Sequence, residues 1–426
     1  MVSLQDRRIW PIFYVAFFYS VCYSKEKRGR DMKLLSVNAG SSTLKFRLYE
    51  MPEECLLMKG QYERIGLEGS CYSLKVGEEK ISSFADIYSH KEAVKLLLEH
   101  LLEYKVVSSL NEIKAVGHRI VHGGNKYSKS IKIDERVLLE VESISPLAPL
   151  HNPAALKGIR AFLDAIPNAC NVACFDTAFH QTMDEETYLY PVPYEWYVKY
   201  DVRKYGFHGL SHKYITEQMS KILGKSPNLI ICHIGSGCSI TAIREGKSID
   251  TSMGFTPNAG IMMGTRSGDI DYSLINYVMK KEERSLDWIE KKLNFESGLQ
   301  GIAGMSDLRD IDRAYEANEQ KVVLAIGMYT QKIVDYIAKY YVKLDGKVDA
   351  ICFTAGGGEN DSIIRANVIQ KLSCFGITLN EEKNNDTIVR KGVEGIISGD
   401  DSKIPVYVLG TDEELMIARD TYNLCK

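Results

Sequence analysis

The chain has 426 residues, which is enough for two or three domains with continuous cores. Its composition, 45% hydrophobic and 26% charged with 33 Gly and 11 Pro, is that of a globular protein and excludes a disordered, collagen-like or coiled-coil chain. With 53 Lys and Arg against 56 Asp and Glu, the formal net charge of −3 excludes a general attraction to nucleic acid or to an anionic membrane.

The first 31 residues differ in character from the rest. An apolar aromatic run from Trp10 to Tyr23 lies between Arg7-Arg8 and the basic residues 25–30. The run is shorter than the roughly 20 apolar residues of a membrane-spanning helix, and no small-residue cleavage site follows it. Met32 then opens a buried-strand pattern directly. We expect residues 1–31 to be a dispensable extension outside the fold; a membrane anchor is the alternative.

One strand-turn-strand pattern occurs twice in the chain. Residues 34–38 and 44–49 predict strands on either side of a small-residue turn at 39–42. The same pattern recurs with strands at 229–234 and 239–243 around Gly235-Ser236-Gly237. Such a duplicate predicts two halves built alike with a ligand between them.

A third strand, predicted at 350–354, runs into a glycine-rich loop at 355–360. Glycine lets backbone N–H groups approach an anion, so three such loops can surround one polyphosphate. Taken alone, either of the two turns between paired strands is more often a plain hairpin.

Helical patterns fill the intervals between these strands. The predicted helices cover residues 91–104, 152–166 with Asn152 as N-cap, 212–223 capped by Ser211, 272–281 capped by Asp271, 321–342 and 413–424. Alternating strands and helices predict α/β layers.

Ten cysteines are scattered along the chain, with no C-x-x-C pair and no Cys/His spacing suited to zinc. We interpret them as buried small apolar residues of a protein in a reducing compartment. Cys170 and Cys174 are four residues apart and could share one helix face, but a metal site there would need further ligands.

Known phosphate-binding motifs are missing. The Gly-Lys-Ser at 246–248 has Thr241 where a P-loop needs its first glycine, and no G-x-G-x-x-G occurs. Instead, arginine or histidine stands among glycines and polar residues in five clusters, at 117–124, 150–153, 175–180, 205–209 and 264–269. Any one of them could be a capped turn, but five together favour a site for phosphate and carboxylate.

The sequence as a whole resembles the acetate kinase family. The resemblance is carried by NAGSSTLK (38–45), GHRIVHGG (117–124), LAPLHNP (147–153), FDTAFH (175–180), YGFHG (205–209), MGFTP (253–257), MMGTRSGDID (262–271), DLRD (307–310), FTAGGGEN (353–360) and TDEELMIARDT (411–421). These segments stand in the family's order and cover the chain from Met32 to about Thr421.

The resemblance implies a fold, an activity and an assembly. The fold is the two-domain α/β fold of acetate and sugar kinases, heat-shock ATPases and actin, ribonuclease H-like with duplicated βββαβα-type cores. We expect an N-terminal domain of residues 32–178 plus 413–426 and a C-terminal nucleotide-binding domain of residues 179–412. The implied reaction is reversible, Mg²⁺-dependent transfer of the ATP γ-phosphoryl group to acetate, giving acetyl phosphate and ADP, with Mn²⁺ as a possible substitute for Mg²⁺. A cytoplasmic homodimer without nucleic-acid or membrane partners is implied as well.

Site residues follow from the resemblance position by position. The catalytic set is Asp176, His208, Arg266 and Arg119. The substrate set is Arg119, Val121, Leu150, Phe207 and Pro257. The nucleotide set is Lys45, His233, Ile234, Gly235, Ser236, Gly237, Asp307, Leu308, Arg309, Gly356, Gly357, Gly358, Glu359 and Asn360. The metal set is Asn38 and Glu413. For Lys45, a ligand contact and a solvated surface position are equally compatible with the sequence.

The chemistry of the reaction agrees with these roles. Acetate is already a carboxylate at neutral pH, so the obstacle is bringing one anion against another, and positive charge must converge. We expect Arg119 to orient the carboxylate, Arg266 and His208 to face the moving phosphoryl group, and Asp176 to hold Mg²⁺ directly or through water rather than act as a base.

Two departures from the family pattern concern the nucleotide. Ser236 stands where the family usually has Asn, and Gly357 replaces an aliphatic residue, so we expect a changed contact to phosphate and a looser wall around adenosine. Three alternatives stay open: a propionate kinase with the same machinery, since one methylene changes binding by only about 1 to 3 kcal/mol, a non-catalytic nucleotide-binding member of the superfamily, and a membrane-tethered kinase.

Overall fold

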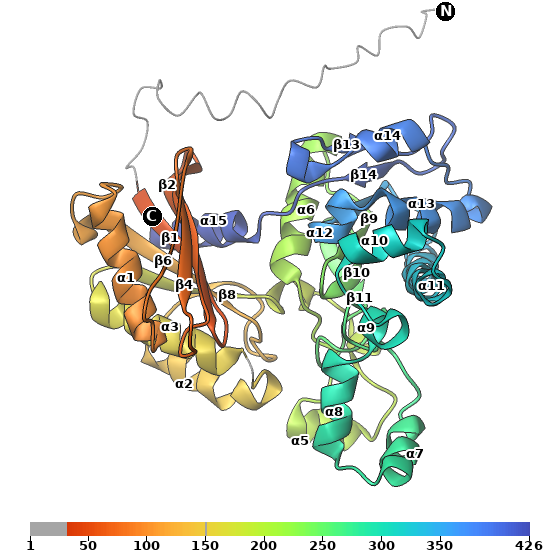
Figure 1. Cartoon of the computed structure of the whole chain (residues 1–426), viewed down its shortest axis with the longest axis horizontal. Coiled ribbons are helices and arrows are strands. Elements are labelled where there is room, and N and C mark those ends of the chain that lie inside the picture. Colours follow the sequence, from red (N-terminus) through yellow and green to blue (C-terminus); the bar gives the residue numbers. More distant parts are fainter. Residues whose placement is uncertain (1–31, 150) are drawn as a thin grey trace, which may run out of the picture.

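The fold consists of two twisted sheets, each covered by helices (Figure 1). A computed structural model describes residues 32–149 and 151–426. The expectations for residues 1–31 and for Leu150 lie outside the described residues. Within them, no helix combines the length and the apolar character that crossing a bilayer requires.

The first sheet has the strand order β5-β4-β3-β2-β1-β6-β8-β7. Its strands are β1 (Met32–Ala39), β2 (Thr43–Met51), β3 (Cys55–Glu63), β4 (Cys71–Val76), β5 (Glu79–Phe84), β6 (Ile113–Ile120), β7 (Ile131–Lys132) and β8 (Cys170–Phe175). The central β1 pairs antiparallel with β2 and parallel with β6, and β6 pairs parallel with β8. The predicted strand-turn-strand unit at 34–49 is confirmed as β1 and β2.

Helices cover both faces of this sheet because β1 is apolar on both sides. Leu34 and Leu35 point to opposite faces and are both fully buried. Leu35 packs in a cluster with α1 (His90–Glu103) and α3 (Asn152–Ala165), and α2 (Glu135–Ser143) packs beside α3. Leu34 packs instead against α15 (Glu413–Cys425), the last helix of the chain, which returns to the first sheet (Figure 1).

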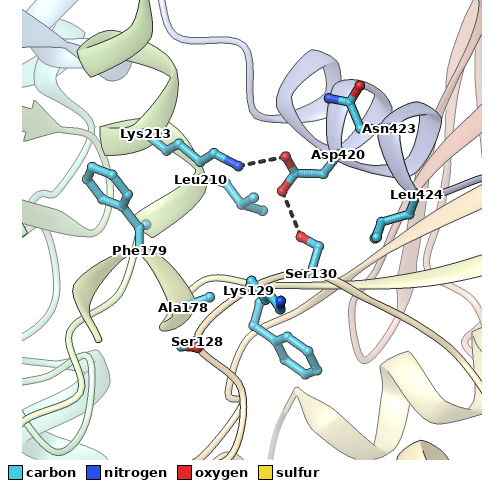
Figure 2. Close-up of a pocket in the computed structure, with 12 residues that line it drawn as sticks. Ser128, Lys129, Ser130, Ala178, Phe179, Leu210, Lys213, Asp420, Asn423 and Leu424 are labelled. Atoms are coloured by element: carbon cyan, nitrogen blue, oxygen red, sulfur yellow. Dashed lines mark hydrogen bonds and ion pairs between the residues drawn. The ribbon is translucent and has the colours of Figure 1, made fainter. Parts of the chain in front are cut away.

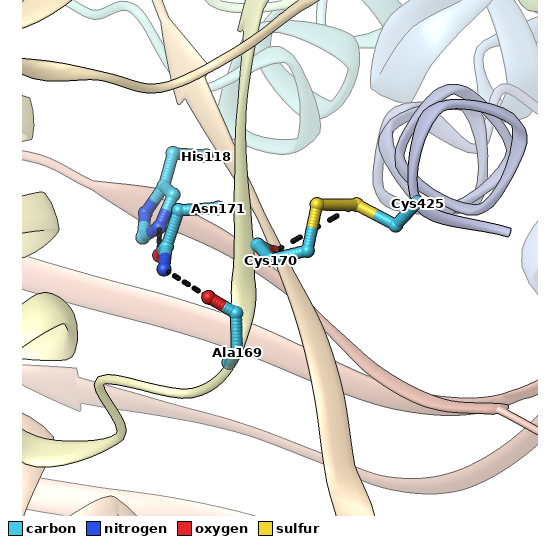
Figure 3. Close-up of a disulfide and its surroundings, with 5 residues drawn as sticks. All are labelled: His118, Ala169, Cys170, Asn171 and Cys425. Carbon is cyan, nitrogen blue, oxygen red and sulfur yellow. Dashed lines mark hydrogen bonds between the residues drawn. A yellow bond between two sulfur atoms is a disulfide. The ribbon is translucent and has the colours of Figure 1, made fainter.

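A disulfide joins this last helix to the sheet. Cys425 at the end of α15 bonds Cys170 at the start of β8, with 6.1 Å between their Cα atoms (Figure 3). The expectation that the cysteines are buried apolar residues in reduced form is therefore wrong for this pair. It is also wrong that Cys170 and Cys174 share a helix, because both lie on β8, where alternating side chains put residues four apart on one face of the sheet.

The second sheet repeats the plan with the order β11-β10-β9-β12-β14-β13. Its strands are β9 (Leu229–Ile234), β10 (Cys238–Arg244), β11 (Lys247–Thr251), β12 (Ala350–Thr354), β13 (Gly395–Ile396) and β14 (Val406–Val408). The central β9 pairs antiparallel with β10 and parallel with β12, as β1 does with β2 and β6. The duplicated pattern read from the sequence is thus present as two similar sheet centres.

The helices that accompany the second sheet are α4 (Glu185–Tyr188), α5 (Tyr194–Tyr200), α6 (Gly209–Leu223), α7 (Ser273–Glu282), α8 (Leu286–Phe295), α9 (Gly298–Ala303), α10 (Leu308–Glu316), α11 (Gln320–Lys343), α12 (Ala355–Asn360), α13 (Ser362–Lys371) and α14 (Glu381–Asp386). The long α11 packs its buried face on β9 and β10, as its apolar spacing predicts.

Three predicted helix starts and one loop need correction. The glycine-rich segment 355–360 is a short helix, α12, because the half-buried Glu359 accepts the Ala355 N–H at 2.9 Å and holds the turn closed. The helix predicted from Ser211 begins at Gly209, with His208 as N-cap in a left-handed conformation. Asn152 lies inside α3 and bonds the His122 backbone instead of capping. Tyr272, not Asp271, is the N-cap of α7, although Asp271 accepts the Ser273 N–H at 2.8 Å.

Candidate active site

Three predicted side chains gather where parallel strands of the first sheet end. Asn38 follows the last β1–β6 pair, Val37 with His118, and Arg119 is the next residue on β6. Asp176 comes directly after the last β6–β8 pair, Ile120 with Phe175. The carboxyl ends of adjacent parallel strands meet at one edge of a sheet, so the strand register itself places these residues together.

Arg119 and Asp176 form a bidentate ion pair at this edge. Arg119 Nε donates to Asp176 Oδ1 at 3.0 Å and Nη2 donates to Oδ2 at 2.5 Å, while the Asp176 side chain is 1% exposed. Burial lowers the pKa of Arg119, but the Asp176 and Glu413 carboxylates outweigh it and hold that pKa above its ordinary value. The guanidinium therefore keeps its charge in a buried position, and its orientation is fixed by two parallel hydrogen bonds.

Glu413 reaches the same edge from the first turn of α15. Its Oε2 lies 3.9 Å from Arg119 Nε. Burial raises the pKa of Glu413 to about 7, with Arg119 acting in the opposite direction. Asp176 and Glu413 thus place carboxylate oxygens around one arginine, and Asn38 lies at the same edge of the sheet.

Arg47 on β2 fixes the first turn of α15 and was missed by the sequence analysis. Its Nη1 donates to Asp412 at 2.7 Å, and its Nη2 lies 3.2 Å from Glu414. Two of three consecutive carboxylates are therefore paired away from Glu413. The three consecutive acidic residues 412–414 are a signal in the sequence, because neighbouring carboxylates repel one another and a cation beside them relieves the repulsion. The sequence does not show that Arg47 is this cation, because 365 residues separate it from Asp412.

The second sheet presents its nucleotide candidates at the matching edge. His233 and Ile234 end β9, the turn Gly235-Ser236-Gly237 follows, and α12 follows the parallel β12, where Thr354 pairs with His233. Lys45 is elsewhere: it lies on β2 opposite Asn38, exposed, in the first sheet. The structure thus brings His233–Gly237 and Gly356–Asn360 together but groups Lys45 with Asn38.

The short helix α12 is held by one side chain of α10 and by hydrogen bonds of its own side chains. A β-carbon on Gly357 would lie 2.6 Å from Leu308 Cδ1, so Leu308 fills the space of the side chain missing there. Glu359 also accepts the Thr411 N–H at 2.9 Å, and the Asn360 amide donates to Gly356 O at 2.9 Å. Asp307 and Arg309 pair with each other at the exposed start of α10, where the Arg309 guanidinium lowers the pKa of Asp307 to about 2.

His208 and Arg266 meet at the turn of the second sheet. A β-carbon on Gly237 would lie 3.2 Å from Arg266 Nη1 and 3.4 Å from His208 Nε2. Arg266 Nη1 also donates to Pro257 O at 3.1 Å, and burial lowers the pKa of this arginine. The two sheet edges meet at this point, because the N–H of Gly209, the residue after His208, donates to the Asp176 backbone oxygen at 2.9 Å. Gly237 has no side chain, which leaves space there for an anion.

The predicted apolar pocket is described in part. Phe207 is 2% exposed, and Val121 packs against the same core. Pro257 is half-buried and bonded to Arg266. The fourth wall residue, Leu150, lies outside the described residues. His122 accepts the Gly124 N–H at 3.0 Å, and its ring lies edge-on to that of Phe207 with the centroids 5.6 Å apart, so it packs and bonds the backbone beside this pocket.

A separate cavity lies between the segments 128–130, 175–179, 209–213 and 420–424 (Figure 2). It measures about 270 Å³ and is lined by Phe175 and Gly209, the neighbours of Asp176 and His208, but not by those two residues themselves. Lys213 of α6 and Asp420 of α15 pair across it at 2.6 Å, and Ser130 donates to Asp420 at 2.7 Å. This network ties the second sheet's α6 to the last helix.

Fold and site together define a two-domain α/β protein with duplicated sheets whose carboxyl edges face each other. The sequence matches the acetokinase family over residues 33–419, and the chain belongs to that family. It is 49% identical over 398 residues to the acetate kinase of Bacillus subtilis, covering 92% of this chain and all of that one.

Solved structures agree with this assignment. The acetate kinase of Porphyromonas gingivalis superposes with a TM-score of 0.87 at 42% identity, covering 93% of this chain and 100% of that one. A propionate kinase from Francisella tularensis gives a TM-score of 0.87 at 41% identity, with 92% and 100% covered. The fold expected from the sequence is confirmed.

Proposed function

We propose that this chain is an acetate kinase, which transfers the γ-phosphoryl group of ATP directly and reversibly to acetate, giving acetyl phosphate and ADP. The observation that carries the proposal is the meeting of Arg266 Nη1 and His208 Nε2 beside Gly237, opposite the Arg119–Asp176 pair. A protein that only bound nucleotide would gain nothing from a second cation, Arg119, held at the facing edge.

Arg119 would bind the acetate carboxylate. Its pair with Asp176 uses Nε and Nη2, which leaves Nη1 without a partner among the described residues. Both Asp176 oxygens accept hydrogen bonds from this arginine, so Asp176 orients Arg119 and is a poor base. No base is needed, because the attacking oxygen of acetate is already ionised at neutral pH.

Arg266 and His208 would stabilise the transferring phosphoryl group. In an in-line step, an acetate oxygen bonds to the γ-phosphorus while the bond from phosphorus to the β,γ-bridging oxygen breaks and its electrons leave with ADP. Fixed donors beside the group's equatorial oxygens cost no reorganisation, and removing one such donor typically costs 10²- to 10³-fold in kcat.

The residues at the first edge fit a hard divalent cation. Mg²⁺ prefers a few oxygen ligands from the protein and completes its shell with phosphate and water, and the Glu413 carboxylate and Asn38 amide supply oxygens of that kind. No group of three or more His, Cys, Asp or Glu among the described residues forms a closed metal site, which agrees with a shell shared with ATP. Bound there, Mg²⁺ or Mn²⁺ would neutralise phosphate charge.

The nucleotide would lie on the second sheet's edge. The turn 235–237 and the start of α12 offer backbone N–H groups, and Asp307–Arg309 stand exposed at the start of α10. Accordingly, residues 179–412 form the proposed nucleotide domain, and residues 32–178 with 413–426 form the proposed acetyl domain. The packing of α15 on Leu34 of the first sheet supports these bounds.

Assembly as a homodimer is supported by an apolar surface on the second domain. Tyr194, Val198 and Tyr200 of α5 and Tyr277 of α7 are each at least 60% exposed, and both helices lie at the same end of that domain (Figure 1). Exposed apolar and aromatic side chains gathered at one end of a domain are typical of an interface. Tyr277→Asp should convert a dimer to a monomer by light scattering; an unchanged mass would exclude this surface.

A cytoplasmic location is supported by four buried free cysteines, Cys174, Cys232, Cys238 and Cys352. The Cys170–Cys425 disulfide is the opposing observation. Alkylation of freshly lysed cells followed by mass spectrometry decides between them: a reduced Cys170–Cys425 pair supports the cytoplasm, and a uniformly oxidised pair excludes it.

The activity test uses protein begun at Met32, with Mg²⁺, ATP and hydroxylamine to trap acyl phosphate. Acetate, propionate, butyrate and no acid are compared, with Arg266→Ala beside the wild type. The expected result is the highest kcat/KM with acetate and a loss of about 10²- to 10³-fold in the variant. A higher kcat/KM with propionate would favour the alternative named by the Francisella neighbour, and ATP binding without turnover would contradict a kinase.

A further inference from the structure

Two buried histidines stack on each other beside the turn of the second sheet. His208 and His233 have ring centroids 4.0 Å apart and an angle of 22° between the planes. His208 Nε2 lies 3.4 Å from the position of a β-carbon on Gly237, and His233 Nε2 lies 3.7 Å from the position of one on Gly235. Both Nε2 atoms therefore face the Gly235-Ser236-Gly237 turn.

The opposite nitrogen of each ring is bonded to a serine. His208 Nδ1 lies 3.0 Å from Ser239 Oγ on β10, and His233 Nδ1 lies 2.8 Å from Ser211 Oγ on α6. Both serines are fully buried. The two histidines thus have the same arrangement, with a hydroxyl behind Nδ1 and a phosphate-binding turn in front of Nε2.

For His233, counting protons decides which nitrogen carries hydrogen. Thr411 Oγ1 donates to Ser211 Oγ at 2.8 Å, and His233 Nδ1 is the one remaining partner of Ser211 Oγ among the described residues, so it receives the single hydroxyl proton. An accepting Nδ1 in a neutral ring puts the ring proton on Nε2. His233 therefore points an N–H group at the turn.

For His208 the same count runs through His212. Ser239 Oγ bonds both His208 Nδ1, at 3.0 Å, and His212 Nε2, at 2.7 Å, and can donate to only one of them. His212 Nδ1 is buried without a partner. If Ser239 donated to His212 Nε2, the His212 ring proton would lie on Nδ1, which would be a buried N–H without an acceptor. If Ser239 donates to His208 Nδ1, His212 Nδ1 keeps only an unpaired lone pair. Buried N–H groups without acceptors are the rarer case, so Ser239 donates to His208.

The surroundings hold both rings neutral. Burial lowers the pKa of His208 well below its usual range, and His233, His212, Arg119 and Arg266 lower it further. Burial and Arg119 lower the pKa of His233 to about 3. A neutral imidazole can donate from one nitrogen only, so the serine behind Nδ1 determines whether the turn is faced by a donor or by a lone pair that would repel phosphate.

We propose that Ser239 and Ser211 are positioning residues that hold His208 and His233 in the tautomer with hydrogen on Nε2, so that both rings donate to phosphate oxygens at the Gly235–Gly237 turn. The proposal rests on the proposed function, because the donor matters only where phosphate binds. It adds two residues that never touch the substrate.

The first test is a double-mutant cycle on Ser239 and His208. Ser239→Ala should lower kcat about tenfold with KM for acetate within about twofold, because His208 loses the partner that selects its donor form. In a His208→Ala background, adding Ser239→Ala should change kcat less than twofold. A tenfold loss in that background would show that Ser239 acts apart from His208 and would overturn the proposal.

The second test reads the tautomer directly and does not depend on turnover. In ¹⁵N-histidine NMR spectra of the intact protein, His208 and His233 should show a protonated Nε2 and an unprotonated Nδ1 between pH 6 and 8, and Ser239→Ala should move the His208 signals toward a mixture. A protonated Nδ1 on His208 in the wild type would contradict the proposal. If His208→Ala kept wild-type kcat while the tautomer signals were as expected, the role of His208 in the proposed function would fail and the assignment of Ser239 would stand.

A matched control is Tyr62→Phe. Tyr62 is another buried hydroxyl bonded to a histidine Nδ1, that of His100 at 2.9 Å, but it lies on β3 against α1. The variant should keep kcat and the His208 signals. Ser239→Thr, which restores a hydroxyl, should recover at least part of the kcat lost in Ser239→Ala; no recovery in a folded protein would argue for a packing role.

Discussion

The two facing sheet edges have similar backbone arrangements but differ in the charge of their side chains. At the first edge, Arg119, Asp176 and Glu413 are charged groups that satisfy one another. At the second, stacked neutral histidines and glycines present N–H groups with little side-chain bulk, and the cation Arg266 lies beside them. The difference teaches that a duplicated unit can divide the work: under the proposed function, one copy would hold the charge that binds a small carboxylate, and the other would offer mainly neutral donors to a polyphosphate.

The largest expected effect comes from breaking the charged edge. Arg119→Ala should lower kcat/KM for acetate by about 10²- to 10³-fold, because the acceptor loses its cation. It should also destabilise the protein by about 3 to 5 kcal/mol, because Asp176, 1% exposed, is left as an unpaired buried charge. Hydroxamate kinetics and urea unfolding measure the two effects.

The paired change Arg119→Ala with Asp176→Ala separates these contributions. It should recover much of the lost stability but none of the activity, since removing both partners removes the unpaired charge while the substrate cation stays absent. An Arg119→Ala variant as active as wild type would exclude this edge as the acetate site.

The next largest effect is expected from acid, which favours unfolding because buried histidines are neutral in the folded protein. Burial lowers the pKa of His180 to about 4 and that of His233 to about 3, whereas unfolded histidine titrates near its ordinary 6.5. Below pH 6.5 the unfolded state therefore binds more protons, so stability is complete above that pH and falls as pH falls toward 4, by up to about 1.4 kcal/mol per pH unit for each histidine. Urea midpoints at pH 7.5, 6.5 and 5.5 measure the slope.

A histidine of the first sheet sharpens this comparison. Burial lowers the pKa of His118 to about 4, and its Nε2 is bonded to Asn171 Oδ1 at 2.8 Å. His118→Gln should reduce the pH dependence of the free energy of unfolding by the contribution of one proton at most. Most of that pH dependence should therefore remain, because it comes from histidines of the second domain and of the segment that joins the two domains. A midpoint that does not change with pH would show that these rings are not neutral in the native state.

The smallest effect is expected at the ion pair that links α6 to α15. Asp420→Asn should cost about 1 kcal/mol or less, because the Lys213–Asp420 pair beside the cavity is only partly buried. If the pair helps to set the approach of the edges, KM for ATP should rise a few-fold while kcat is kept. Lys213→Met should give the same change, and the double variant should give no more; additive effects would mean that the two residues act independently.

The sequence predicts the fold well where a local pattern carries the signal, and it also indicates which cations lie at the two facing edges. Alternation marks β1, β2, β9 and β10 correctly, and the glycine-flanked cations Arg119 and Arg266 do lie at the facing edges. Gly357 shows the limit: its missing side chain suggested a looser wall, but the space is filled by Leu308 of another helix.

What could not be predicted depends on contacts between distant segments. The segment Ala355–Asn360 has no helical periodicity, and its helix is closed by Glu359. The Cys170–Cys425 bond joins residues 255 apart, a pairing that no spacing rule selects. Arg47 and the acidic start of α15 meet for the same reason, through packing of the last helix on the first sheet.

The return of α15 to the first sheet has a consequence for how the protein is made. Ribosomal synthesis releases β1 long before residues 413–426, yet Leu34 of β1 is buried by the helix that those residues form. One face of the earliest strands therefore stays uncovered while the entire second domain is translated, and the second domain can finish folding before the first. Nascent chains stalled before residue 413 should expose that face to chaperones, and early termination should cost the first domain more than the second.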